Sequence, residues 1–167
     1  MVRSEKSKRL IMVSRLLFII YMIFALYVLL MAESFGRTVT DQYRYNLVPF
    51  MEIKRFYSLL GTGWNGKAFL NLFGNVLCFM PFGFYQAIEF RNKKAMIRKV
   101  TLCTFFFSFC VEIVQLIFKI GIFDVDDLIL NTIGGILGGI LYKLLRWVMA
   151  FGKNGACIPI ISLAITS

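Results

Sequence analysis

Four long apolar runs constrain this chain more than any other feature of its sequence. They cover residues 10–32, 68–90, 100–122 and 126–151. Each run exceeds the roughly 20 residues that a helix, rising about 1.5 Å per residue, needs to cross the apolar core of a bilayer. Only 17% of the 167 residues are charged, whereas a soluble domain carries about 25%. We therefore expect an all-α integral membrane protein, built as a four-helix transmembrane bundle.

The remaining segments are short, which indicates one domain. We expect a basic N-terminus at residues 1–9, a single transmembrane domain at 10–155, and a short apolar tail at 156–167. The first run is longer than the apolar core of a signal peptide, which has about 7–15 residues, so we predict an uncleaved first span. The tail is too short to cross a bilayer. We expect it to lie on the membrane surface or to be disordered, and we expect a short surface helix near 50–60.

The basic residues predict the orientation of the chain in the membrane. They gather at the ends of the apolar runs: Arg3, Lys6, Lys8, Arg9, Arg91, Lys93, Lys94, Arg98, Lys99, Lys143, Arg146 and Lys153. The positive-inside rule then places both termini and the 91–99 linker in the cytoplasm, with the 33–67 and 124–127 connections outside. The net charge of +10 does not indicate nucleic acid as a partner, because these cations form no basic stripe on a soluble surface.

Several kinds of chemistry are excluded by composition. The chain has no histidine, and its four cysteines form no C-x-x-C pair. Histidine-based zinc sites, Ser-His triads and imidazole acid–base catalysis are therefore absent, and the cysteines are expected to act as small hydrophobic residues. Any chemistry at a site in this chain must come from carboxylates, amides, hydroxyls, Lys or Arg, or from a hard metal ion that these groups hold. We predict no resident metal ion or other cofactor.

Polar residues follow helical spacing within the last two apolar runs. Glu112 lies inside the third run, where an unpaired charge is costly. Ser108, Gln115 and Lys119 fall on the same helical face as Glu112. On the fourth run, one face combines four residues: Asp127, Asn131, Gly134 and Gly138. A hairpin of these two helices thus directs both polar faces inward.

The predicted topology brings further polar residues to the same depth. The candidate ligand-binding residues are Asn46, Asn71, Asn75, Glu112, Gln115, Asp124, Asp127 and Asn131. All of them lie in the outer half of the bilayer or just above it, beneath the acidic turn at 124–127. We therefore predict a polar pocket in the outer half of the bilayer.

A structural role is open for each of these residues. Glu112 is also consistent with a buried acid that is bonded to Asn75 or Gln115. Asp124 and Asp127 fit caps for the following helix, because Asp is favoured at helix N-termini. Asn71 and Asn75 fit interhelical hydrogen bonding, and Gly134 and Gly138 fit close helix packing. Lys119 fits a counter-ion beside the acidic turn, with phosphate binding as the alternative.

Four motifs in order resemble the VanZ-like family of small bacterial membrane proteins. They read N-L-V-P-F, N-x-x-G-N-x-x-x-F-x-P-F-G, S-x-x-x-E-x-x-Q and D-x-x-D-x-x-x-N-x-x-G-G, and together they cover about residues 46–139. The matching positions are Asn46, Pro49, Phe50, Asn71, Asn75, Phe79, Pro81, Gly83, Ser108, Glu112, Gln115, Asp124, Asp127, Asn131, Gly134 and Gly135. The resemblance implies a multi-pass protein of the bacterial plasma membrane, linked to low-level resistance to teicoplanin-type glycopeptides.

The preferred hypothesis is a non-enzymatic envelope protein. Its pocket would bind an amphiphile, which is either a membrane lipid or lipid-linked cell-wall intermediate, or a lipoglycopeptide antibiotic. The alternative is a metal-assisted enzyme that acts on a lipid head group, with Glu112 as the general base and a divalent cation held by Asp124 and Asp127. A weaker third hypothesis is a small transporter in which Glu112 carries a proton.

Overall fold

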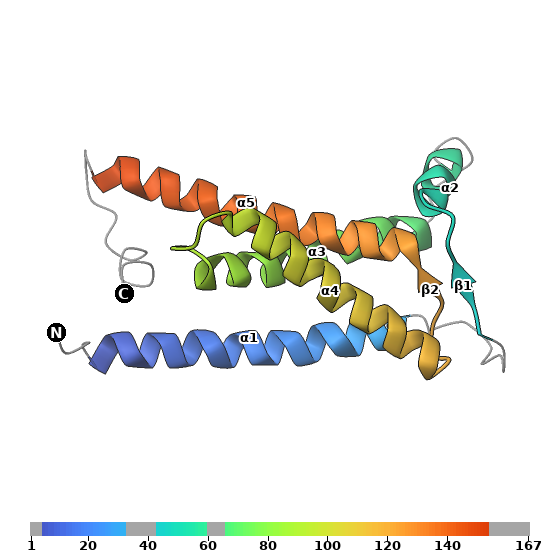
Figure 1. Ribbon diagram of the computed structural model, residues 1–167, viewed down its shortest axis with the longest axis horizontal. Coiled ribbons are helices and arrows are strands. Elements are labelled where there is room, and N and C mark those ends of the chain that lie inside the picture. Colours follow the sequence, from blue (N-terminus) through green and yellow to red (C-terminus); the bar gives the residue numbers. More distant parts are fainter. Residues whose placement is uncertain (1–4, 33–42, 60–65, 154–167) are drawn as a thin grey trace.

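The structure is a mostly helical assembly that runs along one long axis (Figure 1). This computed structural model describes residues 5–32, 43–59 and 66–153. The tail at 156–167 therefore lies outside the described residues. The elements, in order, are α1 (Glu5–Ala32), β1 (Tyr45–Asn46), α2 (Met51–Leu59), α3 (Gly66–Glu89), α4 (Met96–Ile117), β2 (Phe123–Asp124) and α5 (Val125–Lys153).

Three helices in the described part of the chain are long and apolar enough to cross a membrane. These segments are Lys8–Leu30 in α1, Met96–Ile117 in α4 and Val125–Phe151 in α5. Large apolar side chains such as Leu16, Phe106 and Leu144 are exposed on them, which fits a surface that faces lipid. The run at 68–90 forms the helix α3 as expected, but α3 is not among the three. The fourth crossing therefore stays a prediction.

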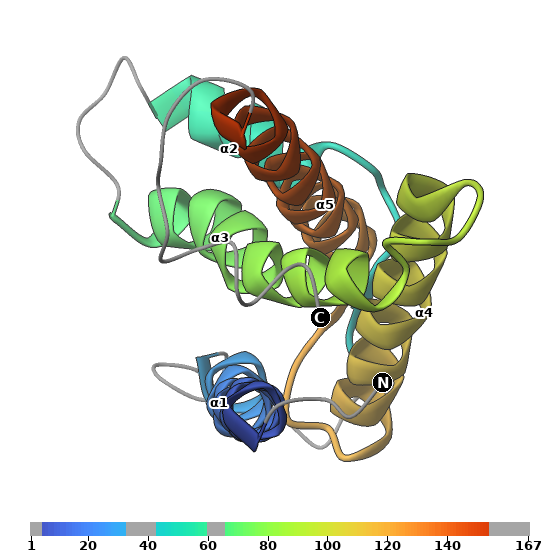
Figure 2. The ribbon, with the colours of Figure 1, turned by 90° about the vertical axis from the view of Figure 1, so that its left-hand side faces the viewer.

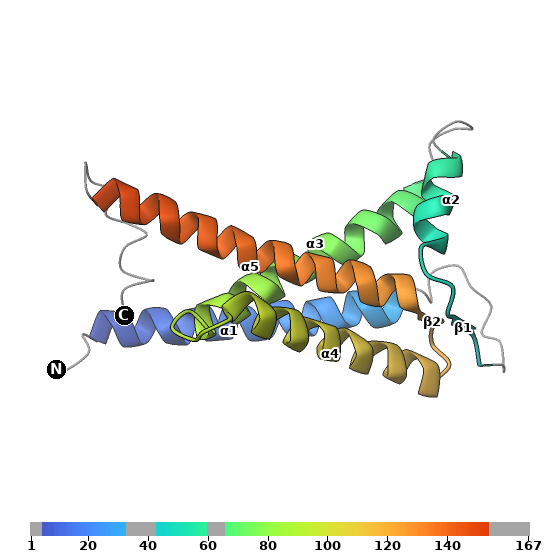
Figure 3. The same cartoon turned by 45° about the horizontal axis from the view of Figure 1, so that its top comes forward.

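Helices α3 and α5 cross in close contact (Figure 3). The crossing depends on glycine, because a Cβ atom on Gly134 would overlap the carbonyl oxygen of Val76. A Cβ atom on Gly138 would likewise overlap the carbonyl oxygen of Met80. Small residues four apart let two helix backbones approach in this way. The predicted packing role of the Gly134–Gly138 pair is confirmed.

Helix α1 lies to one side of the other helices (Figure 2). Only 6% of its apolar span is buried, against 44% for α5. Its contacts with α3 include the hydroxyl of Tyr21, which donates to the carbonyl oxygen of Cys78. The ring of Phe18 also stacks on Tyr85, with 3.8 Å between centroids. A few specific contacts thus hold α1 beside a more closely packed group of helices.

The boundaries of the elements differ from the predicted runs, most clearly at the start of α1 and at the end of α4. Helix α1 begins at Glu5, so the described part of the basic N-terminus is helical rather than separate from the span. Helix α4 ends at Ile117 instead of residue 122, because Lys119 adopts a left-handed conformation with φ 55° and the chain reverses there. The freed carbonyl of Gln115 accepts the Ile120 N–H at 3.1 Å.

Two short strands qualify the all-α prediction. Strands β1 and β2 pair in parallel, with Tyr45 opposite Phe123 and Asn46 opposite Asp124. The pairing gives hydrogen-bond partners to backbone groups in two loops that run side by side at one end of the molecule (Figure 1). It fixes the N-L-V-P-F loop against the start of α5.

Candidate functional site

The candidate residues gather at the end of the molecule where α4 stops and α5 begins. Strands β1 and β2 and helix α2 lie at this same end (Figure 1). The turn between α4 and α5 is short, so the acidic residues after it fold back over the end of α4. The site is therefore built from segments that are far apart in the sequence.

Glu112 lies on α4, one turn before Leu116, and is 2% exposed. Its Oε2 atom accepts the backbone N–H of Asp124 at 3.0 Å. The sequence suggested Asn75 or Gln115 as a partner, whereas the structure shows the Asp124 backbone in this role and bonds those two amides to Asp127 and Leu29. Because this bond is to the backbone of Asp124, the buried Glu112 side chain holds the reversal between α4 and α5 against the end of α4.

Asp124 caps α5 and binds the N-L-V-P-F loop as well. Its Oδ1 atom accepts the backbone N–H of Asp126, in the first turn of α5, at 2.8 Å. Its Oδ2 atom accepts Nδ2 of Asn46 at 3.1 Å. The capping role that was open for Asp124 is confirmed, and Asn46 is placed beside it. One carboxylate thus serves both the helix and the loop.

Asp126 was not among the candidate residues, although it stands in the same acidic turn. It is 1% exposed, and its Oδ1 atom accepts the backbone N–H of Phe50 at 2.5 Å. Phe50 immediately precedes α2 and has a left-handed backbone with φ 66°. The sequence did predict a short helix near this point, and the N–H groups at the start of a helix need hydrogen-bond acceptors from elsewhere. Nothing in the local pattern names Asp126 as that acceptor.

Asn75 joins α3 to the site through Asp127. The Nδ2 atom of Asn75 donates to Oδ1 of Asp127 at 2.6 Å, which links α3 and α5. The interhelical role considered for Asn75 is confirmed. Asn71 lies one turn before Asn75 on α3 and is partly buried.

Two amide side chains lie deeper and keep an oxygen atom available. Asn131 donates through Nδ2 to the hydroxyl of Ser108 at 2.8 Å, and Gln115 donates through Nε2 to the carbonyl oxygen of Leu29 in α1 at 2.9 Å. Oδ1 of Asn131 and Oε1 of Gln115 are buried and have no hydrogen-bond partner among the described residues. A buried acceptor of this kind is costly unless a water molecule or a ligand donates to it.

Lys119 lies at the reversal between α4 and α5. Its Nζ atom is 5.1 Å from the centroid of the Tyr43 ring. This geometry matches a cation–π contact, in which the ring face attracts a positive charge. The sequence predicted a counter-ion for the acidic turn, and the structure adds an aromatic contact with the segment that leads into β1.

The metal-assisted alternative requires acidic side chains that converge on one ion. Among residues 5–32, 43–59 and 66–153, no three acidic or cysteine side chains are placed to hold a metal ion. Asp124 and Asp127 instead accept hydrogen bonds from Asn46 and Asn75. These contacts support a hydrogen-bond network that positions the loops and helices, and they do not resemble a metal centre.

The fold and the site define a class: a small α-helical membrane protein in which buried polar side chains fasten a loop to the ends of the helices. The chain belongs to the VanZ/LLP1 family, whose sequence model matches residues 18–146. It is also 37% identical over 76 residues to Protein VanZ of Enterococcus faecium, a stretch that covers 46% of each chain. The match thus spans about half the length of that curated relative. No solved structure matches this chain.

Proposed function

We propose that this VanZ-family protein binds the polar head of an amphiphile at the outer face of the bacterial plasma membrane and thereby contributes to teicoplanin-type glycopeptide resistance. The ligand is a lipoglycopeptide or a lipid-linked cell-wall intermediate, which combines an apolar chain with a polar head. The family membership and the similarity to Protein VanZ support the link to resistance.

The pair of buried amide oxygens carries this proposal. Gln115 and Asn131 each use the nitrogen of the amide within the protein and leave the oxygen without a described partner. Such oxygens accept hydrogen bonds from hydroxyl, amide N–H or ammonium groups. Those donors are abundant on sugars and peptides, so the head group of a glycolipid or a lipoglycopeptide matches the site.

The loosely held helix α1 supports a route for the apolar chain. Gln115 donates a hydrogen bond to α1 at the Leu29 carbonyl, near the end of that helix. Since little of α1 is buried, a shift of this helix disturbs few packed side chains. An acyl chain in the outer leaflet would enter beside α1 while its head group reaches the amides.

The proposal includes a topology of four crossings, with α3 as the fourth, and both termini in the cytoplasm. Cations at the opposite end of the helices, in the 91–99 linker and beyond Tyr142 in α5, support this orientation. The carboxylate end then faces outward, where a glycopeptide arrives.

A binding measurement on the purified protein in nanodiscs tests the proposal. Teicoplanin, its deacylated form and vancomycin would each be titrated, with binding followed by native mass spectrometry. We expect teicoplanin to bind most tightly. The Gln115→Leu and Asn131→Leu variants should weaken its binding by about fivefold or more, the loss expected for one neutral hydrogen bond of about 1 kcal/mol.

The control is Thr101→Val. Thr101 lies on α4 away from the site, and its hydroxyl donates within its own helix to the Ile97 carbonyl. This variant should bind teicoplanin like the wild type. Equal affinity for all three glycopeptides, or unchanged binding by the two amide variants, would refute the proposed site.

A further inference from the structure

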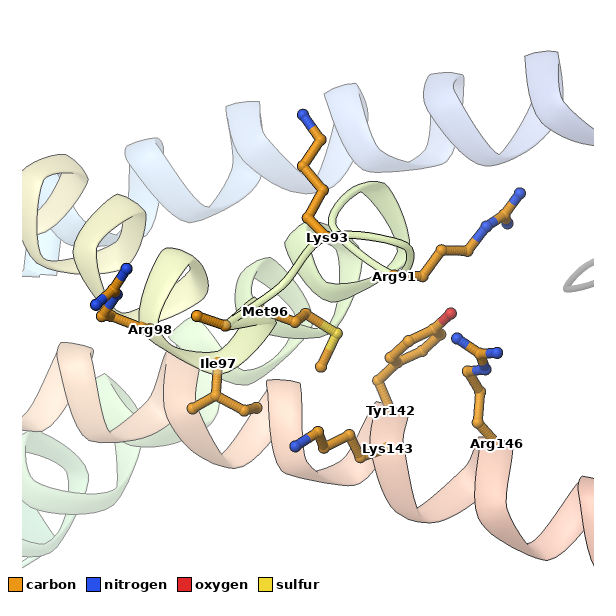
Figure 4. Close-up of a pocket in the computed structure, with 9 residues that line it drawn as sticks. Arg91, Lys93, Met96, Ile97, Arg98, Tyr142, Lys143 and Arg146 are labelled. Carbon is orange, nitrogen blue, oxygen red and sulfur yellow. The ribbon is translucent and has the colours of Figure 1, made fainter.

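A second site lies at the opposite end of the helices from the carboxylates. A cavity of about 460 Å³ opens between the linker that joins α3 to α4 and the C-terminal half of α5 (Figure 4). Its volume is within the range of small-molecule sites, which are about 300–1,000 Å³. None of the candidate residues at the carboxylate end lines it.

The lining of this cavity is strongly basic. Five cationic side chains contribute to it: Arg91, Lys93, Arg98, Lys143 and Arg146. No acidic residue is part of the lining, and the sequence from Phe90 to Val111 and from Asn131 to Lys153 contains none. Four of these five residues are exposed, so water and salt screen much of their mutual repulsion, but together they give the space a positive potential that attracts anions. The cavity therefore fits a ligand with more than one negative charge or several acceptor oxygens.

A buried hydroxyl group adds an independent sign of a ligand. Tyr142 lines the cavity and is 1% exposed, and its hydroxyl has no hydrogen-bond partner among the described residues. In Figure 4 the hydroxyl points to the same side as the guanidinium groups of Arg91 and Arg146. The Arg146 guanidinium is 6.0 Å from the centroid of the Tyr142 ring. A buried tyrosine hydroxyl usually finds an acceptor, and an anionic oxygen in the cavity would supply one.

We propose that this cavity binds the phosphate group of an anionic membrane lipid in the cytoplasmic leaflet. Arginine pairs with phosphate through two parallel hydrogen bonds, and lysine adds a compact charge. Basic pockets between membrane helices on the cytoplasmic side recognise lipid head groups by this chemistry. The inference uses none of the residues of the proposed glycopeptide site, and it shares with that proposal only the orientation of the helices in the membrane.

The surroundings of the cavity favour a lipid over a free phosphate ion. The apolar side chains of Met96 and Ile97 line the cavity beside the cations. Trp147, one turn beyond Lys143 on α5, is 58% exposed, and tryptophan is typical of the boundary between lipid and water. A ligand that lies here therefore has an apolar part next to its charged part, as a phospholipid does.

Native mass spectrometry of the full chain tests this inference. The protein would be taken from nanodiscs that contain equal amounts of phosphatidylglycerol and phosphatidylcholine, and the lipid that stays bound would be identified. Lys143→Gln with Arg146→Gln removes two cations from the lining, and both side chains are exposed, so the fold should tolerate the change. Lys94→Gln with Lys99→Gln is the matched control, because it removes the same charge at the same end but outside the lining.

We expect the wild type to retain phosphatidylglycerol. In the variant with Lys143→Gln and Arg146→Gln, retention should fall about tenfold or more, since a charge-assisted hydrogen bond contributes about 1.5–3 kcal/mol. The control should change retention by about twofold or less, which corresponds to weak surface electrostatics. Tyr142→Phe keeps the ring, and it should lower retention by a few fold if the hydroxyl donates to phosphate.

Three outcomes would overturn the inference. Equal retention of both lipids by the wild type would show that the cavity does not select a charged head group. Equal losses in the lining variant and the control would show a general surface attraction. If inorganic phosphate in lipid-free detergent binds with the same dependence on Lys143 and Arg146, and phosphatidylglycerol does not compete with it, the site takes a soluble phosphate rather than a lipid.

Discussion

Glu112 and Asp124 are joined across the reversal between α4 and α5, with 3.0 Å between Oε2 of Glu112 and the backbone nitrogen of Asp124. Asp124 in turn caps α5 and binds Asn46 of the N-L-V-P-F loop. One buried acid thus positions the residue that holds both a helix and a loop. The carboxylates at this end of the molecule form a chain of contacts rather than a cluster around one point.

Asp124→Ala should destabilise the protein by about 1–2 kcal/mol, the usual cost of removing a helix N-cap, and it also removes the acceptor for Asn46. Asp124→Asn should cost less, because its amide oxygen still caps the helix. Thermal unfolding in detergent, followed by intrinsic fluorescence, measures the difference. An Asp124→Ala protein as stable as the wild type would contradict the capping geometry.

Asn75 and Asp127 should be energetically coupled, because Nδ2 of Asn75 lies 2.6 Å from Oδ1 of Asp127. A double-mutant cycle with Asn75→Ala and Asp127→Ala should give a coupling free energy of about 1 kcal/mol, within the range for polar contacts between membrane helices. The cycle needs the same unfolding measurement on all four proteins. Free-energy changes that add within about 0.3 kcal/mol would mean that the two side chains do not interact.

The glycines of α3 and α5 provide a matched pair of substitutions. Gly138→Ala should destabilise the protein by about 1–3 kcal/mol, since the added methyl group overlaps the Met80 carbonyl at the helix crossing. Gly74→Ala meets no atom within 4 Å, so it should be neutral or stabilise the helix by up to about 1 kcal/mol. Unfolding temperatures in one detergent compare them. The reverse order would contradict the crossing.

Much of the fold was predictable because apolar length and glycine spacing act locally. The four runs correspond to helices, and the spacing of Gly134 and Gly138 predicted the close crossing. The end of α4 was predicted five residues too late, because residues up to Ile122 are mostly apolar and only the left-handed turn at Lys119 stops the helix. The β1–β2 pair was missed because two-residue strands carry no periodic pattern.

The candidate site was predictable in its members but not in its bonds. Glu112 was recognised because a charge inside an apolar run is costly, and Asp127 because it shares a helical face with Asn131 next to the acidic turn. Their partners depend on how distant loops return, and no spacing rule gives the bond between Asp126 and the Phe50 backbone. The basic cavity was missed for a related reason, since its cations were interpreted as topology signals alone.

The four-crossing topology predicts which side of the membrane each loop faces. In a cysteine-free background, Ser58→Cys in α2 should react with a membrane-impermeant maleimide added to intact cells. Lys94→Cys in the α3–α4 linker should react only after the membrane is opened. Both positions are exposed in the structure, so burial does not limit the reaction. Labelling of both positions from the same side would mean that α3 does not cross.

Susceptibility to teicoplanin and vancomycin in a sensitive Gram-positive host tests the central claim most directly. The wild-type protein would be compared with Gln115→Leu and Asn131→Leu, at matched abundance in the membrane. We predict that the wild type protects against teicoplanin but not vancomycin and that both variants lose this protection, because each removes one of the amide oxygens proposed to accept hydrogen bonds from the ligand. Abundant variants that still protect, or a wild type that gives no protection, would contradict the proposed role.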